Sequence, residues 1–337
     1  MTTTRASDEV FAPVWWARSG FAQTVATAFD RRRHATSLRL QDVDLPDGDR
    51  VRSWWADAPD ANAPLVLLLH GLEGSRDSVY AVETARLCAQ RGFGFVVLEF
   101  RSCGGVMNRA RRTYHSGETG DLDFVVESLT RAAPQRPLFT VGFSLGGNVL
   151  LKWLGERGDR APSQLLAAAA VSPPFDLEMA ARRCDERYRG LFARHFLRTM
   201  VPKALAKERQ YPGCLDANAV RRCRTFAAFD DLATAPLHGF RDARHYWTEA
   251  SCMRFLPAVR RPTLLVASSD DPLIPAEALP RAAAADSRFL VPHFLDRGGH
   301  VGFVEGGAPW SQRRWVERRV VDFFVRHCAG VGVAASS

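Results

Sequence analysis

The segment Gly142-Phe143-Ser144-Leu145-Gly146 has the GxSxG spacing of a serine held on a tight turn between a strand and a helix. It follows the apolar run 138–141 and precedes a stretch that suits a helix. Larger side chains at the glycine positions would collide with neighbouring backbone on such a turn. The turn would expose the hydroxyl and aim N–H groups of the new helix at a bound carbonyl. We therefore interpret Ser144 as a nucleophile rather than part of an ordinary turn.

A serine hydroxyl becomes nucleophilic only beside a base that a carboxylate orients. Asp270 and Asp271 follow an expected strand and precede a Pro-Leu-Ile-Pro run. We favour Asp271, which stands directly before that run, and Asp270 remains the alternative. An Asx-type turn before proline would account for one aspartate without any catalysis.

Nine histidines could supply the base. His300 follows Gly298 and Gly299 in the loop after the last expected strand, and it completes the chain order serine, aspartate, histidine. His70 is the other histidine at a strand end, but we expect it to pack and to hydrogen-bond its own loop. The sequence therefore predicts a triad of Ser144, Asp271 and His300.

A tetrahedral intermediate also needs donors for its oxyanion. In this arrangement one donor is the backbone N–H after the nucleophile, which belongs to Leu145. The second comes from the loop after an early strand, where His70-Gly71-Leu72-Glu73-Gly74 stands, and we assign it to the N–H of Leu72.

Short apolar runs alternate with stretches that suit helices, which is typical of an α/β fold with a mostly parallel, doubly wound sheet. The expected strands cover 65–69, 95–100, 138–142, 165–171, 262–267 and 289–294, and the expected helices cover about 75–90, 117–131, 145–156 and 310–327. We divide the chain into an N-terminal extension with early strands (1–60), a core (61–175 and 261–328), a helical lid (176–260) and a flexible tail (329–337).

The lid is expected because the alternation stops between about 175 and 260, where apolar residues recur at helical spacing. We propose from this stripe that Phe192, Phe196, Leu197 and Met200 bind the acyl part of a substrate. A stripe of this kind is also what ordinary core packing produces.

Charge and cysteine content argue against several other classes of protein. The net charge is +8, but the basic residues are scattered, so no nucleic-acid partner is expected. The seven cysteines form no CxxC pair, and we expect neither disulfides nor a metal or other cofactor. We see no signal peptide and no transmembrane segment, and we expect a cytoplasmic protein.

The sequence as a whole resembles the YheT-like α/β-hydrolases over about residues 11–324. The segments that carry the resemblance are Phe21-Ala22-Gln23-Thr24, His70-Gly71-Leu72-Glu73-Gly74-Ser75, Phe100-Arg101-Ser102-Cys103-Gly104-Gly105, Tyr114 to Asp121, Gly142 to Asn148, Ser172 to Leu177, Phe229 to Phe240 and Gly298 to Phe303. Glu99 and Trp247 stand where members often have asparagine and tyrosine. The resemblance implies the same triad and the hydrolysis of acyl esters, acylglycerols or phospholipids.

These observations favour a serine hydrolase that cleaves carboxylic esters, either short- to medium-chain acyl esters or acylglycerol-type lipids, through an acyl-serine intermediate. Its partner would be a small-molecule or lipid ester. Two alternatives remain open, namely acyl transfer to an alcohol and a non-catalytic binding protein on the same fold. Dinucleotide binding is disfavoured because Gly142 to Gly147 lacks the GxGxxG spacing.

Overall fold

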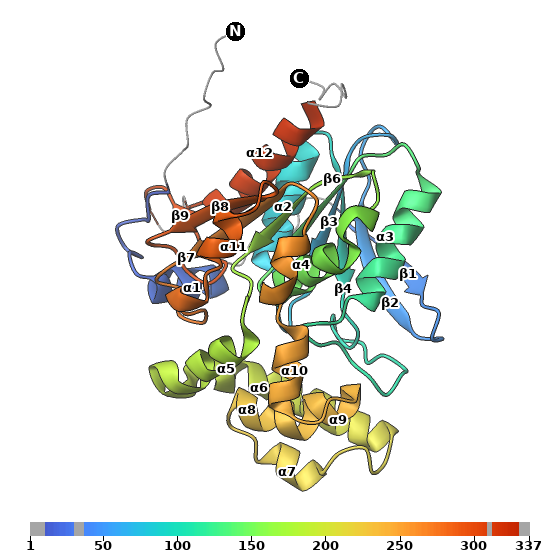
Figure 1. Ribbon diagram of the computed structural model, residues 1–337, viewed down its shortest axis with the longest axis vertical. Helices are drawn as coiled ribbons and strands as arrows, with labels where there is room; N and C mark the ends of the chain where they lie inside the picture. Colours follow the sequence, from blue (N-terminus) through green and yellow to red (C-terminus); the bar gives the residue numbers. More distant parts are fainter. Residues whose placement is uncertain (1–10, 30–36, 309–311, 330–337) are drawn as a thin grey trace.

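The computed structural model describes residues 11–29, 37–308 and 312–329 (Figure 1). Within these ranges the chain forms an eight-stranded sheet, covered on both faces by helices, and a separate two-stranded ribbon. The α/β class and the mostly parallel, doubly wound sheet that the sequence predicts are confirmed.

The strands of the large sheet lie in the order β1-β2-β4-β3-β5-β6-β7-β8. β1 and β2 form an antiparallel edge, and every pair from β4 to β8 is parallel. The bounds are β1 Arg39–Asp44, β2 Arg50–Ala56, β3 Leu65–Leu69, β4 Gly94–Glu99, β5 Leu138–Phe143, β6 Leu165–Val171, β7 Thr263–Ser268 and β8 Leu290–Leu295. Because the parallel strands point the same way, the loops at their carboxyl ends meet along one edge of the sheet.

Side chains of the central strands alternate between two apolar clusters. In β3, Leu65, Leu67 and Leu69 pack with α3, α4 and α11 on one face, whereas Val66 and Leu68 pack with α2 and α12 on the other. The helices are α2 Val79–Gln90, α3 Gly120–Ala132, α4 Leu145–Arg157, α11 Arg281–Ala285 and α12 Trp315–Ala329. A strand buried on both faces has to be apolar at every position, which explains the continuous apolar runs in the sequence.

Between β6 and β7 the chain leaves the sheet and forms a group of helices at one end of the core (Figure 1). We call this group the insertion; its helices are α5 Leu177–Glu186, α6 Leu191–Gln210, α7 Ala217–Arg221, α8 Phe226–Phe229, a π-helical turn Asp230–Thr234, α9 Ala235–His238 and α10 Ala243–Ala250. The segment after α10 returns to the core, since Cys252, Leu256 and Val259 pack in the same cluster as α4. The part that stands outside the core therefore ends about ten residues before the position 260 expected from the sequence.

The chain ends differ in detail from the sequence expectations. The N-terminal region supplies β1, β2 and the helix α1 (Gly20–Phe29). α12 begins at Trp315 rather than at 310, because Arg313–Arg314 (β10) pairs with Val304–Glu305 (β9). The tail expected over 329–337 lies, after residue 329, outside the described residues, as do the first ten residues of the expected extension.

Two buried cations hold the long loop between β4 and α3. The guanidinium of Arg101 donates to Asp49 (2.8 Å) and to Asp121 (2.7 Å) and is screened from solvent. From the insertion, the ammonium group of Lys207 on α6 donates to the carbonyl of Asn108 (2.7 Å), and burial lowers the pKa of this lysine to about 8. α6 is thereby anchored to the core.

His70 joins the ends of β3 and β4. Its Nδ1 lies 2.7 Å from the carbonyl oxygen of Gly71, and its Nε2 lies 3.1 Å from the backbone N–H of Phe100. The Phe100 N–H can only donate, so Nε2 accepts and the proton of the neutral ring is on Nδ1. Both ring nitrogens are occupied by backbone groups, as the sequence interpretation of a packing role expects.

We expect the ring of His70 to remain neutral in the folded protein down to about pH 4, because burial lowers its pKa to about 4. The unfolded chain takes up this proton near pH 6.5, so the free energy of unfolding falls as the pH decreases from about 6.5 towards 4. Imidazole ¹⁵N shifts followed by NMR measure the midpoint directly. The same titration in denaturant is the control and should return it to about 6.5. A midpoint near 6.5 in the folded protein would contradict the buried, neutral ring.

Candidate active site

Ser144 lies on the turn between β5 and α4 with φ 52° and ψ −120°, a backbone conformation that residues other than glycine rarely adopt. The glycines on either side make room for this turn. A Cβ on Gly142 would lie 2.3 Å from the carbonyl oxygen of Gly146, and a Cβ on Gly146 would lie 2.4 Å from that of Leu69. The close approach of β3, β5 and α4 therefore requires glycine at both positions.

Two later loops bring a base and an acid to this serine. Nε2 of His300, in the loop after β8, lies 2.7 Å from Oγ of Ser144. Nδ1 of the same ring lies 3.0 Å from Oδ2 of Asp271, in the loop after β7. The other oxygen, Oδ1, accepts the backbone N–H groups of Leu273 (2.7 Å) and Ile274 (3.1 Å), which fixes the carboxylate. Asp271 is 1% exposed and His300 is 6% exposed, so the pair is shielded from bulk water.

The neighbouring aspartate has a different partner. Oδ1 of Asp270 accepts the backbone N–H of Gly298 at 2.9 Å, and partial burial raises the pKa of this carboxyl. Asp270 therefore ties the loop after β7 to the loop that carries His300, while Asp271 contacts the ring itself. Of the two candidates that the sequence leaves open, the structure brings Asp271 to the histidine.

α1 supports the histidine loop from outside the strand-and-helix core. Oγ1 of Thr24 accepts the backbone N–H of His300 at 2.7 Å. The amide of the fully buried Gln23 accepts from the N–H of Val304 (2.6 Å) and donates to its carbonyl (3.1 Å). A Cβ on Gly302 would lie 2.4 Å from the Gln23 carbonyl oxygen, so the loop passes α1 at close range. Residue types alone do not predict these contacts between α1 and the histidine loop. The one sequence feature that points to α1 is the resemblance of residues 21–24 to the family.

Both expected oxyanion donors are free to bind a ligand. Among the described residues, neither the N–H of Leu72 nor that of Leu145 donates to a protein acceptor. Leu72 follows β3 and Leu145 opens α4, and both line the same cavity as Ser144 and His300. Unpaired N–H groups beside a nucleophile can stabilise charge that develops on a carbonyl oxygen.

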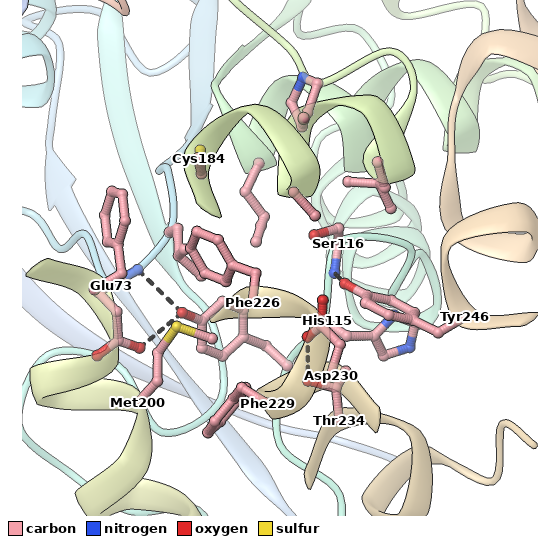
Figure 2. Close-up of a pocket in the computed structure, with 18 of the residues that line it drawn as sticks. Glu73, His115, Ser116, Cys184, Met200, Phe226, Phe229, Asp230, Thr234 and Tyr246 are labelled. Atoms are coloured by element: carbon pink, nitrogen blue, oxygen red, sulfur yellow. Dashed lines mark hydrogen bonds between the residues drawn. The ribbon is translucent and has the colours of Figure 1, made fainter. Parts of the chain in front are cut away.

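The cavity lies between the carboxyl ends of the strands and the insertion, and the space within it and at its open mouth measures about 1060 Å³. Figure 2 shows part of the lining, with Met200, Phe226 and Phe229 from the insertion opposite residues of the core. Its lining is mainly apolar, and such a space suits hydrocarbon chains.

Two of the four residues that the sequence assigns to substrate binding line this cavity, namely Phe196 and Met200. They lie one turn apart on α6 and share a face. Leu197 is one residue further round the helix, and it packs inside the insertion with 5% exposure. Phe192 is not among the residues that line the cavity; it packs against the apolar cluster behind that lining, and its ring is 6.0 Å from that of Phe21 on α1. The apolar periodicity of the sequence predicts this helix, but it does not tell which of the apolar residues face the cavity and which face the interior of the insertion.

Polar residues of the cavity are engaged by neighbours. The Asp230 carboxylate accepts from Thr234 Oγ1 (2.7 Å) and from Trp247 Nε1 (2.8 Å), and burial raises its pKa to about 6. Cys184 also lines the cavity, but burial raises the pKa of its thiol, which disfavours a thiolate nucleophile. Reasoning from the sequence assigns no role to Asp230 or Cys184, although Asp230 lies in the segment 229–240 that carries the family resemblance.

Within 11–29, 37–308 and 312–329, no group of histidine, cysteine and acidic side chains is arranged to hold a metal ion. In the same part of the chain, no helix has both the length and the apolar character that a membrane span requires.

Comparison with known proteins identifies the family. Residues 64–307 match the model of the alpha/beta hydrolase fold family. The chain is 33% identical to YheT of Escherichia coli (strain K12), with 97% of each chain covered. It is 28% identical to the phospholipase ABHD3 of Bos taurus, covering 94% of this chain and 78% of that protein.

A monoacylglycerol lipase of Saccharomyces cerevisiae is 29% identical, with 80% of this chain and 59% of that protein covered. Among solved structures, the Pyrococcus furiosus esterase Pf2001 superposes with a TM-score of 0.58 at 16% identity, over 87% of this chain and 91% of the other, which shows the shared fold. The chain belongs to the α/β-hydrolase family, among its YheT-like members.

Proposed function

We propose that the protein is a serine hydrolase that cleaves carboxylic esters through an acyl-serine intermediate. The observation that carries this proposal is the connected series Ser144 Oγ, His300 and Asp271, with hydrogen-bond distances of 2.7 and 3.0 Å. It lies in an apolar cavity beside the N–H groups of Leu72 and Leu145, for which the described ranges offer no protein acceptor. Such a set supplies a nucleophile, a base with its orienting acid, and a site for the oxyanion.

In the proposed reaction, Oγ of Ser144 attacks the ester carbonyl while Nε2 of His300 takes the hydroxyl proton. Asp271 holds the ring so that Nδ1 carries the other proton, and it stabilises the imidazolium that forms. The carbonyl oxygen becomes an oxyanion and accepts from the N–H groups of Leu72 and Leu145. The imidazolium then protonates the leaving alcohol, and water, deprotonated by the same ring, releases the acid and restores the serine.

The substrate is proposed to be a short- to medium-chain acyl ester or an acylglycerol-type lipid. The apolar lining, with Phe196 and Met200 on the insertion side, supports an acyl chain as the part that is bound. The names of two relatives, a phospholipase and a monoacylglycerol lipase, support a lipid-type ester.

Replacing the nucleophile tests the proposal most directly. Ser144→Ala should lower kcat on p-nitrophenyl esters by about 10⁴-fold or more, because only binding and oxyanion stabilisation remain. A fluorophosphonate probe should label the wild-type protein and not the variant, and circular dichroism should show an unchanged fold. Undiminished labelling of the variant would place the nucleophile elsewhere.

The two aspartates form a matched pair for a second test. Asp271→Asn should reduce kcat by about 10⁴-fold, because an amide cannot hold the required histidine tautomer. Asp270→Asn keeps an oxygen that can accept the Gly298 N–H, and it should retain most of the activity. The assignment is wrong if both variants are equally active or if their order is reversed.

The pocket assignment is tested with esters of increasing chain length. Each buried methylene contributes about 0.8 kcal/mol, so kcat/KM should rise about fourfold per added methylene until the pocket is full. Phe196→Ala should move the optimum to longer chains because it removes a wall of the cavity. Phe192→Ala, on the same helix but off the cavity lining, is the control and should keep the wild-type profile. If the wild-type protein and both variants show the same dependence on chain length, Phe196 contributes only to packing and not to the acyl pocket.

A further inference from the structure

A short series of side chains links the insertion to the loop that holds Leu72. The ammonium group of Lys203 on α6 donates to Oε1 of Glu73 at 2.8 Å. The hydroxyl of Tyr114 donates to the same oxygen at 2.8 Å and accepts the backbone N–H of Glu73 at 3.0 Å. Dashed lines in Figure 2 mark two hydrogen bonds of Glu73, one from its side chain and one from its backbone N–H. The side chain of Glu73 is thus held by Lys203 from α6 and by Tyr114 from the loop before α3, and its backbone N–H is held by the same tyrosine.

The backbone at Glu73 needs such support. Its φ is 58°, in the left-handed region that non-glycine residues avoid, so local preference alone does not keep the loop in this shape. The Glu73 side chain is 10% exposed, and the ring of Tyr114 stacks on Phe100 at 5.7 Å. Tyr114 is therefore a fixed support in the core, whereas Lys203 comes from the insertion.

Glu73 directly follows Leu72, whose N–H has no acceptor among the described residues and is the proposed oxyanion donor from this loop. The peptide between Leu72 and Glu73 carries the N–H that Tyr114 holds, and the Leu72 N–H lies in the preceding peptide, so a displacement of Glu73 moves that donor through the backbone torsions of Leu72. Oxyanion stabilisation is sensitive to such movement, since donors must lie about 2.7–3.1 Å from the developing charge. The contact with Lys203 consequently bears on the reaction, although Lys203 is not one of the triad.

We propose that Lys203 is a positioning residue, which holds Glu73 and so aims the Leu72 N–H at the reacting carbonyl when α6 is seated over the cavity. This inference rests on the proposed function, because it assigns a second role to the same site. The oxyanion site is then complete only while the insertion covers it. Lys207, one turn further along α6, contacts the loop at Asn108 instead and anchors the helix without touching Glu73.

Lys203→Met tests the proposal because it keeps the alkyl chain and removes the charge. The variant should lower kcat by about 10-fold, less than the roughly 10²–10³-fold for deletion of an oxyanion donor, because the Leu72 N–H is displaced rather than lost. KM for a short p-nitrophenyl ester should change by less than about 3-fold, as expected for an interaction made in the transition state. Lys203→Arg should restore most of kcat.

A double-mutant cycle and an inhibitor sharpen the test. Glu73→Gln should lower kcat in the same direction, and adding it to Lys203→Met should cause little further loss, because both changes break one interaction. A trifluoromethyl ketone forms a tetrahedral adduct with the serine, so its inhibition constant should rise by the same factor as kcat/KM falls. Arg198→Met, which removes an exposed charge from the same helix, is the matched control; it should leave kcat and the inhibition constant at their wild-type values.

Two results would overturn the inference. One is unchanged kcat in Lys203→Met, and the other is an equal loss of kcat in Lys203→Met and Arg198→Met. Failure of the proposed function has a different signature, in which the wild-type protein does not hydrolyse esters and Ser144 does not react with the fluorophosphonate.

Discussion

The backbone of Ser144 is held at a positive φ, in a conformation that residues other than glycine rarely adopt, at the point where β5 becomes α4, and the rest of the site is built around that turn. Gly142 and Gly146 allow the strand, the turn and the neighbouring β3 to approach without collision. Because β5 lies in the middle of the parallel sheet, the serine emerges where loops from several other strands also end. Strain at one residue is thus maintained by the packing of the whole sheet.

The groups around the serine divide into those already engaged and those left free. The carboxylate of Asp271 is held by two backbone N–H groups and the histidine ring, and both nitrogens of His70 are taken up by backbone groups. The N–H groups of Leu72 and Leu145 have no protein acceptor in the described part of the chain. In an apolar cavity, an unpaired donor interacts strongly with any charge that forms nearby, because little water competes for it.

The sequence predicts the sheet and the turn well, because both depend on local patterns. Continuous apolar runs mark strands buried on both faces, and GxSxG directly after such a run marks the tight turn. Chain order, together with a place in the loops after late strands, then leads to His300 among nine histidines and to the pair Asp270 and Asp271. The choice between Asp270 and Asp271 needs side-chain directions, which adjacent positions in one loop do not reveal.

Contacts between distant segments could not be foreseen in the same way. Thr24 contacts His300, which lies 276 residues further along the chain, and no pattern of residue types predicts that contact. Along α6, periodicity finds the apolar stripe, but the rotation of the helix against the core decides that Phe196 faces the cavity and Leu197 does not. Lys203 was overlooked for a related reason, since a charged residue beside an apolar stripe is typical of a solvated helix face.

The contact between α1 and the histidine loop shows which segments of the chain must stay together for the site to keep its structure. The segment that matches the family model runs from 64 to 307, so it leaves out α1 together with the threonine that holds the backbone of His300. Gln23 and Thr27 of this helix also contact the last part of the chain, through Val304 and Arg314. Recombination or domain transfer at the ends of the matched segment would carry the triad residues but leave their support behind. The shortest segment that would carry both the site and its support therefore begins in the N-terminal region with α1 and ends only after the last strand of the large sheet.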